Sequence, residues 1–254
     1  MNETVAQLVA LSRSLGRPER DLVVLAEGNT SVALGDGTFL VKSSGARLES
    51  VSANDCIRLR LPPLLEAVVD GGAADAGELF AAARVATSPG DGRPSIETFV
   101  HVAALGVAGA RWVAHTHPTA LTALLCSPDG TEALLAGPLF PDEAVVCGPV
   151  PLYVPYAEPG LELGRAVALA LREHVSAHGH PPRTILLENH GLVALGESAA
   201  EVEAVTTMAA KAARLRAAAL AAGRIRPLAA ASVAELGARA DERERRARLA
   251  GDRP

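Results

Sequence analysis

The chain has 254 residues, of which 49% are hydrophobic and only 3% aromatic, and its formal net charge is −5. This composition favours one large domain with an aliphatic core; the negative charge disfavours general nucleic-acid binding, and no run of about 18 apolar residues predicts a membrane helix. The N-terminal segment lacks the basic and apolar blocks of a signal peptide, and three widely spaced cysteines fit a reducing compartment. A cytoplasmic protein without a membrane partner is therefore expected.

The first sixty residues are expected to form one helix and three short strands. The helix is expected at 1–16, and the strands at 23–25, 39–41 and 57–61. Two small polar loops, Glu27–Ser31 and Lys42–Gly45, follow the first two strands. Such loops can turn N–H groups and hydroxyls toward an anion, although the same residues are common in ordinary turns. Lys42 adds a positive charge, which favours anion binding.

A helix is expected to begin at Pro94 and to end at Gly106, because apolar residues recur there at helical spacing. Glu97 lies in its first turn and four residues before His101, so these two side chains are expected to be neighbours. A first-turn acid is often only a solvated partner of the helix dipole. The short distance along the chain to a pair of histidines makes Glu97 a candidate acid/base group as well.

That pair lies in Trp112–Ala120, where an apolar strand ends in His115-Thr116-His117-Pro118. Residues i and i+2 of a strand point to the same face, so His115 and His117 can direct both imidazoles at one point. Imidazole is the commonest metal-ligating side chain, and two of them make half of a tetrahedral site. The alternative is a pair of unliganded histidines at a strand end. A helix is expected at 118–125.

The second half of the chain is expected to alternate strands and helices. Short strands are expected at 145–146, 150–154, 184–187 and 192–195, and helices at 161–177, 198–222 and from about 232 onward. His174, His178 and His180 fall at one helix end, where positive charge is favoured, and are interpreted as structural or surface residues.

His190 lies in Glu188-Asn189-His190-Gly191, between the strands expected at 184–187 and 192–195. A histidine in such a tight turn can project as a third metal ligand. It can also be a simple turn residue, because Asn-His-Gly tolerates left-handed backbone. Residues 1–228 are expected to form one domain, and 229–254 a charged helical tail that is solvated or paired with a neighbouring segment.

Several of these motifs recur in one order, and together they resemble the class II aldolase/adducin family. The matching pieces are Glu27-Gly28-Asn29-Thr30-Ser31, Lys42-Ser43-Ser44-Gly45, Pro94-Ser95-Ile96-Glu97, His115-Thr116-His117-Pro118, Val154-Pro155-Tyr156 with Pro159-Gly160, and Asn189-His190-Gly191. The resemblance implies an α/β fold, a three-layer αβα sandwich around a central, mainly antiparallel sheet. It also implies a homotetramer with active sites at subunit interfaces.

Carried over by residue, the resemblance identifies His115, His117 and His190 as zinc ligands, with Mn²⁺ or Co²⁺ as alternative ions, and Glu97 as the acid/base group. It assigns phosphate binding to Asn29, Ser31, Ser44, Gly45 and Ser95. In such aldolases the metal stabilises the enediolate left when a ketose 1-phosphate is cleaved, and the carboxylate moves the proton.

Three departures from the pattern of fuculose-type enzymes bear on the reaction and its substrate. Tyr153 and Tyr156 are the only tyrosines, so the C-terminal tyrosine that serves family aldolases and epimerases as a second acid is absent. Ile96 replaces the second serine that precedes the glutamate in fuculose-type enzymes. The Lys42–Gly45 loop is more similar to the aldolase half of bacterial rhamnulose-phosphate aldolase/dehydrogenase proteins.

The leading prediction is thus a zinc-dependent aldolase, a lyase of carbohydrate metabolism, that cleaves a phosphorylated sugar. A pentulose-phosphate 4-epimerase and a sugar-acid dehydratase or decarboxylase would use the same metal site. A non-catalytic adducin-like interaction module is disfavoured, because the chain has all three candidate ligands and the glutamate.

Overall fold

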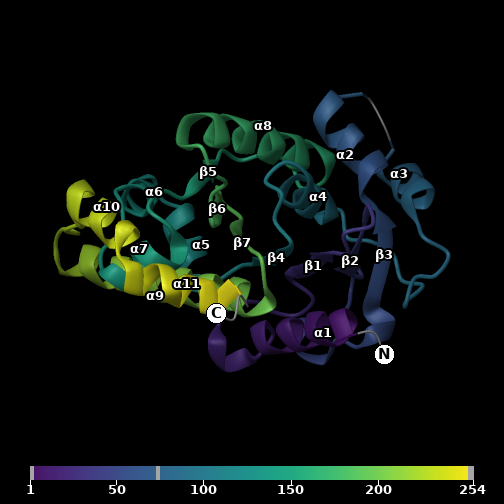
Figure 1. Ribbon diagram of the computed structural model, residues 1–254, viewed down its shortest axis with the longest axis horizontal. Coiled ribbons are helices and arrows are strands. Elements are labelled where there is room, and N and C mark those ends of the chain that lie inside the picture. Colours follow the sequence, from purple (N-terminus) through teal and green to yellow (C-terminus); the bar gives the residue numbers. More distant parts are fainter. Residues whose placement is uncertain (1–2, 73–74, 251–254) are drawn as a thin grey trace.

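A seven-stranded sheet runs through the centre of the computed structural model, which describes residues 3–72 and 75–250. The strands lie in the order β3-β2-β1-β4-β7-β6-β5 (Figure 1). Their bounds are β1 Asn29–Ala33, β2 Thr38–Lys42, β3 Cys56–Arg60, β4 Trp112–Thr116, β5 Leu152–Val154, β6 Thr184–Leu187 and β7 Gly191–Gly196.

The sheet is mixed, and this corrects the expectation of a mainly antiparallel sheet. The difference lies at one edge. Strand β5 runs parallel to β6, whereas the other neighbouring strands are antiparallel. The parallel pair follows from the long helix α8 (Leu161–His178), which lies between β5 and β6 in the chain. A helical crossover returns the chain to the end of the sheet where it began, so the next strand runs in the same direction.

Helices pack on both faces of the sheet. The remaining bounds are α1 Glu3–Leu15, α2 Leu61–Asp70, α3 Ala76–Ala83, α4 Thr98–Gly106, α5 Thr119–Leu125, α6 Pro128–Leu135, α7 Pro141–Cys147, α9 Ala199–Ala222, α10 Ala230–Ala238 and α11 Ala240–Ala250. Helices α2, α4 and α8 lie on one side of the sheet, and α1 and α9 on the other (Figure 1).

Strand β4 shows why both faces are covered. Val113 packs in the cluster that includes Phe99 of α4, whereas Trp112 and Ala114 pack in the cluster that includes Leu8 of α1. Alternate side chains of one strand thus enter opposite cores. Both clusters consist mainly of leucine, valine and alanine, as the low aromatic content predicts.

Three local predictions were wrong. Residues 23–25 form no strand; Leu25 has a φ of 55° and is 71% exposed. Residues 145–146 lie in helix α7, which begins at Pro141 and buries that apolar pair; short apolar runs do not distinguish strand from helix. The helix expected from Pro94 begins at Thr98, because Pro94 instead bridges to Ser43 of the polar loop after β2.

The histidine strand lies at the centre of the sheet. In the register, Asn29 of β1 is paired with His115 of β4 on one side, and Val193 of β7 is paired with His115 on the other. Two hydrogen-bonded neighbours fix the position of this strand end more firmly than a sheet edge would. Within the described residues no helix is long and apolar enough to cross a membrane.

Helix α8 approaches α4 closely at Gly164. A Cβ built on Gly164 would lie 2.6 Å from the Cβ of Phe99, which is fully buried two residues after Glu97. We expect Gly164→Ala to lower the free energy of unfolding by about 1–3 kcal/mol in urea, because the overpacked helices must separate. Gly72→Ala, with no atom within 4 Å of the added Cβ, is the matched control. Equal stability of both variants would contradict this packing.

Candidate metal centre

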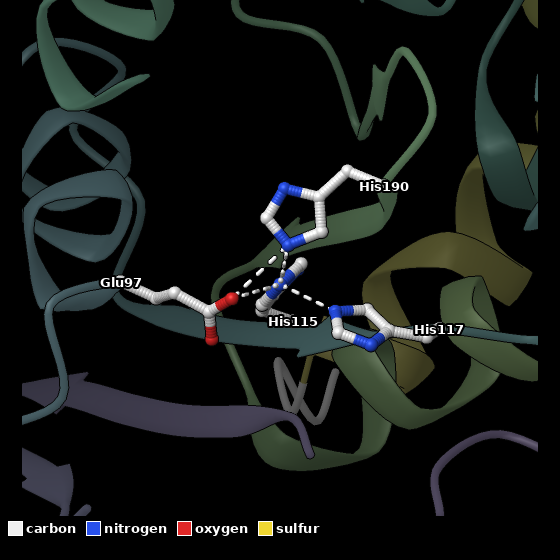
Figure 2. Close-up of side chains that lie close together, drawn as sticks. All are labelled: Glu97, His115, His117 and His190. Carbon is white, nitrogen blue, oxygen red and sulfur yellow. Dashed lines mark hydrogen bonds and ion pairs between the residues drawn. The ribbon is translucent and has the colours of Figure 1, made fainter. Parts of the chain in front are cut away.

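Four side chains from three separate segments converge at the end of β4 (Figure 2). The Nε2 atom of His115 lies 3.0 Å from Nε2 of His117 and 3.2 Å from Nε2 of His190. The Oε1 atom of Glu97 lies 3.0 Å from Nε2 of His190 and 3.6 Å from Nε2 of His115. One ligand atom from each of the four lies within 4.8 Å of the others. The structure thus brings together the four residues that the sequence singles out as metal ligands and acid/base group.

The backbone around these residues explains their positions. His190 lies in the turn between β6 and β7, where Asn189 takes a left-handed φ of 51°. Gly191 follows, and a Cβ there would lie 2.6 Å from the carbonyl oxygen of Thr116. Gly28 has a φ of 75°, and a Cβ added to it would lie 2.9 Å from the carbonyl oxygen of His115. Glycine at both positions therefore lets two loops approach the histidine strand.

The nitrogens opposite the centre have partners of their own. Nδ1 of His115 lies 3.0 Å from the carbonyl oxygen of Leu192, and Nδ1 of His117 lies 3.5 Å from Oε2 of Glu27. A carbonyl can only accept a hydrogen bond, so Nδ1 of His115 donates and its Nε2 carries a lone pair. Such outer contacts orient a ligating imidazole and raise its basicity.

Electrostatics favour an ionised carboxylate at Glu97 and a neutral ring at His117. Burial by itself raises the pKa of Glu97, but the hydrogen bonds and charges of His115 and His190 outweigh it and lower that pKa. Burial, and then the neighbouring His115 and His190, lower the pKa of His117 to about 3. At neutral pH the side chains of Glu97 and His117 are thus in the protonation states that a metal requires, because ligating groups must be deprotonated.

The donor set fits a divalent metal. Three imidazole nitrogens and one carboxylate oxygen make a four-coordinate N₃O set of the type that zinc accepts, and other divalent first-row ions bind imidazole too. His115, His117 and His190 would hold the ion, and Glu97 could complete the set.

Of the predicted phosphate-binding residues, Asn29 and Ser31 lie on β1, the strand next to β4, and are buried. The Asn29 amide nitrogen donates to Oε2 of Glu97 at 3.4 Å, and its Oδ1 has no hydrogen-bond partner among the described residues. The Ser31 hydroxyl lies 2.7 Å from Nδ1 of His101. Asn29 thus contacts the acid/base group directly, whereas the hydroxyl of Ser31 is occupied by an internal contact.

The other three lie in two loops that meet beside Glu97. Ser44 and Gly45 are exposed, and the backbone N–H of Ser44 donates to the carbonyl of Arg93 at 2.7 Å. The hydroxyl of Ser95 accepts from the backbone N–H of Glu97 at 3.3 Å. These contacts connect the polar loop after β2 to the segment that carries Glu97.

Lys42 connects this loop to the one that begins at Glu27. Its side chain is buried, and Nζ donates to the carbonyls of Ala26 at 3.4 Å and Ala46 at 2.6 Å. Burial lowers the pKa of Lys42 to about 8, opposed by the charges of Glu97 and Asp55. The two candidate anion-binding loops are thus joined by a buried cation.

Sequence reasoning missed the supporting roles of Glu27 and His101. The sequence marks Glu27 only as the first residue of a polar loop, and its place beside His117 depends on how that loop folds back. His101 is expected to neighbour Glu97, but its ring points to Ser31, and its buried Nε2 has no partner among the described residues. The i, i+4 spacing was the available signal, and it does not fix the direction of a ring.

Comparisons with known proteins agree with this fold. L-fuculose 1-phosphate aldolase superposes with a TM-score of 0.70 at 18% identity, covering 93% of this chain and 95% of that one. YgbL from Klebsiella pneumoniae, a putative aldolase/epimerase/decarboxylase, superposes with a TM-score of 0.69 at 27% identity, covering 93% and 99%. YgbL from Escherichia coli, described in the same words, gives 0.68 at 23%, covering 92% and 98%.

A curated relative, the uncharacterized oxidoreductase YuxG of Bacillus subtilis (strain 168), is 27% identical over 202 residues. The match covers 76% of this chain but only 27% of that protein, so the chain spans about a quarter of the length of this relative. The family model of the class II aldolase and adducin N-terminal domain matches residues 6–217. The chain therefore belongs to the class II aldolase and adducin family.

Proposed function

We propose that this protein is a zinc-dependent lyase that cleaves a phosphorylated sugar, such as a ketose 1-phosphate, by retro-aldol chemistry. The observation that carries the proposal is the convergence of the Nε2 atoms of His115, His117 and His190 with the carboxylate of Glu97. A bound zinc ion supplies a Lewis acid that polarises a substrate oxygen.

Glu97 is the proton carrier in this proposal. Its carboxylate is ionised and retains 18% side-chain exposure, so it can exchange its contact with the histidines for one with the substrate. Glu97 lies on the segment just before α4. Its Oε2 accepts a hydrogen bond from the amide of Asn29, and its backbone N–H donates to the hydroxyl of Ser95. These two contacts orient the carboxylate toward the histidines, as an acid/base group near a reacting carbon requires.

The phosphate is assigned to the exposed loop at Ser44 and Gly45, with Ser95 and Asn29 beside it. Gly45 has a φ of 78° and leaves its N–H unshielded by a side chain, a feature of backbone anion sites. The positive charge of Lys42 lies under this loop. Ser31 would contribute only if its hydroxyl left His101.

The alternatives share the metal site and differ in the second proton carrier. An epimerase, a dehydratase or a decarboxylase would use the same histidines, and the YgbL proteins are described as putative aldolase/epimerase/decarboxylase. The absence of a tyrosine from the C-terminal region weakens the epimerase alternative most, and a cleavage reaction would also need its second acid from another group. The same proposal includes a homotetramer, a cytoplasmic location, the αβα layering of the family and a domain that ends at residue 228.

The function is tested by metal content and aldol cleavage together. We expect protein purified without chelators to contain at least one zinc per chain and to cleave at least one member of a panel of ketose 1-phosphates. His115→Ala should lose one equivalent of zinc and the cleavage activity, because His115 contacts each of the other two histidines. Absence of any divalent metal from the wild-type protein would overturn the mechanism. Metal without cleavage would favour one of the alternative reactions.

Glu97→Gln separates the proton carrier from the metal ligands. We expect the variant to keep its zinc, because three imidazoles remain, and to lose about 10²–10⁴-fold in kcat, the usual contribution of a positioned acid/base group. Glu66→Gln, an exposed glutamate on α2, is the matched control and should leave kcat unchanged. Unchanged turnover in Glu97→Gln would remove Glu97 from this role.

Lys42 gives a prediction on stability and pH. Since its pKa is about 8 in the folded protein and 10.5 ordinarily, the unfolded chain binds the extra proton between these pH values, and stability rises with pH across this window. The difference in unfolding free energy between wild type and Lys42→Met should therefore change in that direction from pH 8 to 10.5. Lys211→Met, which alters the only other lysine, is the comparison variant. A flat difference for Lys42→Met would contradict a depressed pKa.

A further inference from the structure

The seven histidines of the chain fall into two groups. Four, including His101, lie at or next to the candidate metal centre. The other three are His174 and His178, one turn apart at the end of α8, and His180, two residues beyond. Strand β6 separates the two groups along the chain: His180 comes before it, and the turn with His190 comes after it. The four residues of β6 span about 13 Å, so the two groups are separate.

The rings of the second group are close to each other. The centroids of His174 and His178 are 4.4 Å apart, and that of His180 lies 6.3 Å from each. In the candidate metal centre the corresponding distances are 4.7, 4.9 and 5.0 Å. The helical pair is therefore as close together as the rings of the candidate metal centre, and the exposed His180 would need to approach by a little more than 1 Å to match them.

Two of the three rings, those of His174 and His180, have a ring nitrogen that could bind a ligand. His174 is only 6% exposed, yet its buried Nε2 has no hydrogen-bond partner among the described residues. A buried polar atom without a partner is costly and needs an explanation. Nδ1 of His180 lies 3.0 Å from the carbonyl oxygen of Pro181, so it donates and Nε2 keeps the lone pair. His115 has the same carbonyl contact in the candidate metal centre.

The local charge also favours a cation. His178 is the last residue of α8, and Gly179 ends the helix in a left-handed conformation. The carbonyls at a helix C-terminus carry partial negative charge, which attracts positive charge. Burial, with smaller contributions from the neighbouring His178 and His180, lowers the pKa of His174. This ring is therefore neutral at pH 7 and can ligate without losing a proton.

We propose that His174, His178 and His180 form a second metal site, for a divalent transition-metal ion of the Zn²⁺, Ni²⁺ or Cu²⁺ class. Imidazole suits these ions, and three imidazoles leave a coordination position for water. Bound metal ties the end of α8 to the segment 179–183 that leads into β6. The site is independent of the proposed cleavage reaction and uses none of its residues.

The experiment is a titration of metal-free full-length protein with Zn²⁺, counting the equivalents bound per chain. The variant His178→Ala/His180→Ala changes two exposed side chains, so the fold is retained. We expect wild type to bind one equivalent more than this variant, and Ser176→Ala, an exposed change on the same helical turn, to bind as wild type does.

Equal numbers of equivalents in wild type and the double variant would overturn the proposal. Loss of the extra equivalent in Ser176→Ala as well would do the same, because the ion would then not depend on the histidines. Cleavage activity of the double variant is expected to equal that of wild type. A failure of the proposed function would appear instead as loss of the equivalent that depends on His115.

Discussion

The partly buried negative charge of Glu97 is the constraint on which the rest of the candidate site depends. A carboxylate removed from water needs positive charge or hydrogen-bond donors around it. Its neighbours are two imidazole nitrogens and the amide of Asn29. Nε2 of His115 lies close to Nε2 of His117, to Nε2 of His190 and to Oε1 of Glu97, so electron-rich atoms crowd around one point. A divalent cation at their common point resolves this, since every one of the four groups can donate an electron pair to it.

The sheet makes such an arrangement stable. His115 is fully buried on the central strand β4, between β1 and β7. His190 is held by the hairpin between β6 and β7, and Gly28 and Gly191 allow close approach of the neighbouring loops. Ligands on paired strands and tight turns lose little entropy when they bind, because their backbone is already fixed. Glu97 lies just before α4 rather than in the sheet, on a segment where a proton carrier can move.

The sequence contains enough to predict the metal ligands but not their surroundings. The i, i+2 spacing of His115 and His117 is a local property of a strand, and the turn at His190 is marked by Asn189 and Gly191. The ordered motifs supplied the family and the role of Glu97. Contacts such as that of Ser31 with His101 join residues 70 apart, and no local pattern specifies them.

The wrong predictions concern features that local sequence patterns do not determine. Short apolar runs such as Val145-Val146 satisfy either a strand or a helix, and the helix formed because Pro141 and two first-turn acids favour its start. At Pro94 the same helix signal lost to a tertiary contact, the bridge to Ser43. The parallel edge of the sheet depends on strand order, which periodicity does not contain. The split between domain and tail at residue 228 stays a prediction.

The metal ligands and the anion-binding loops differ in how firmly they constrain the reaction. His115 is fixed by the sheet, so in the proposed reaction the geometry at the metal would change little with the substrate. Ser44 and Gly45 are exposed, and Ile96, which is 51% exposed, presents an apolar surface where fuculose-type enzymes have a hydroxyl. A phosphate held here must therefore rely on backbone N–H groups and on the charge of Lys42 rather than on a second serine. In the proposed reaction, substrate choice would then depend on the polar loop after β2 more than on the metal.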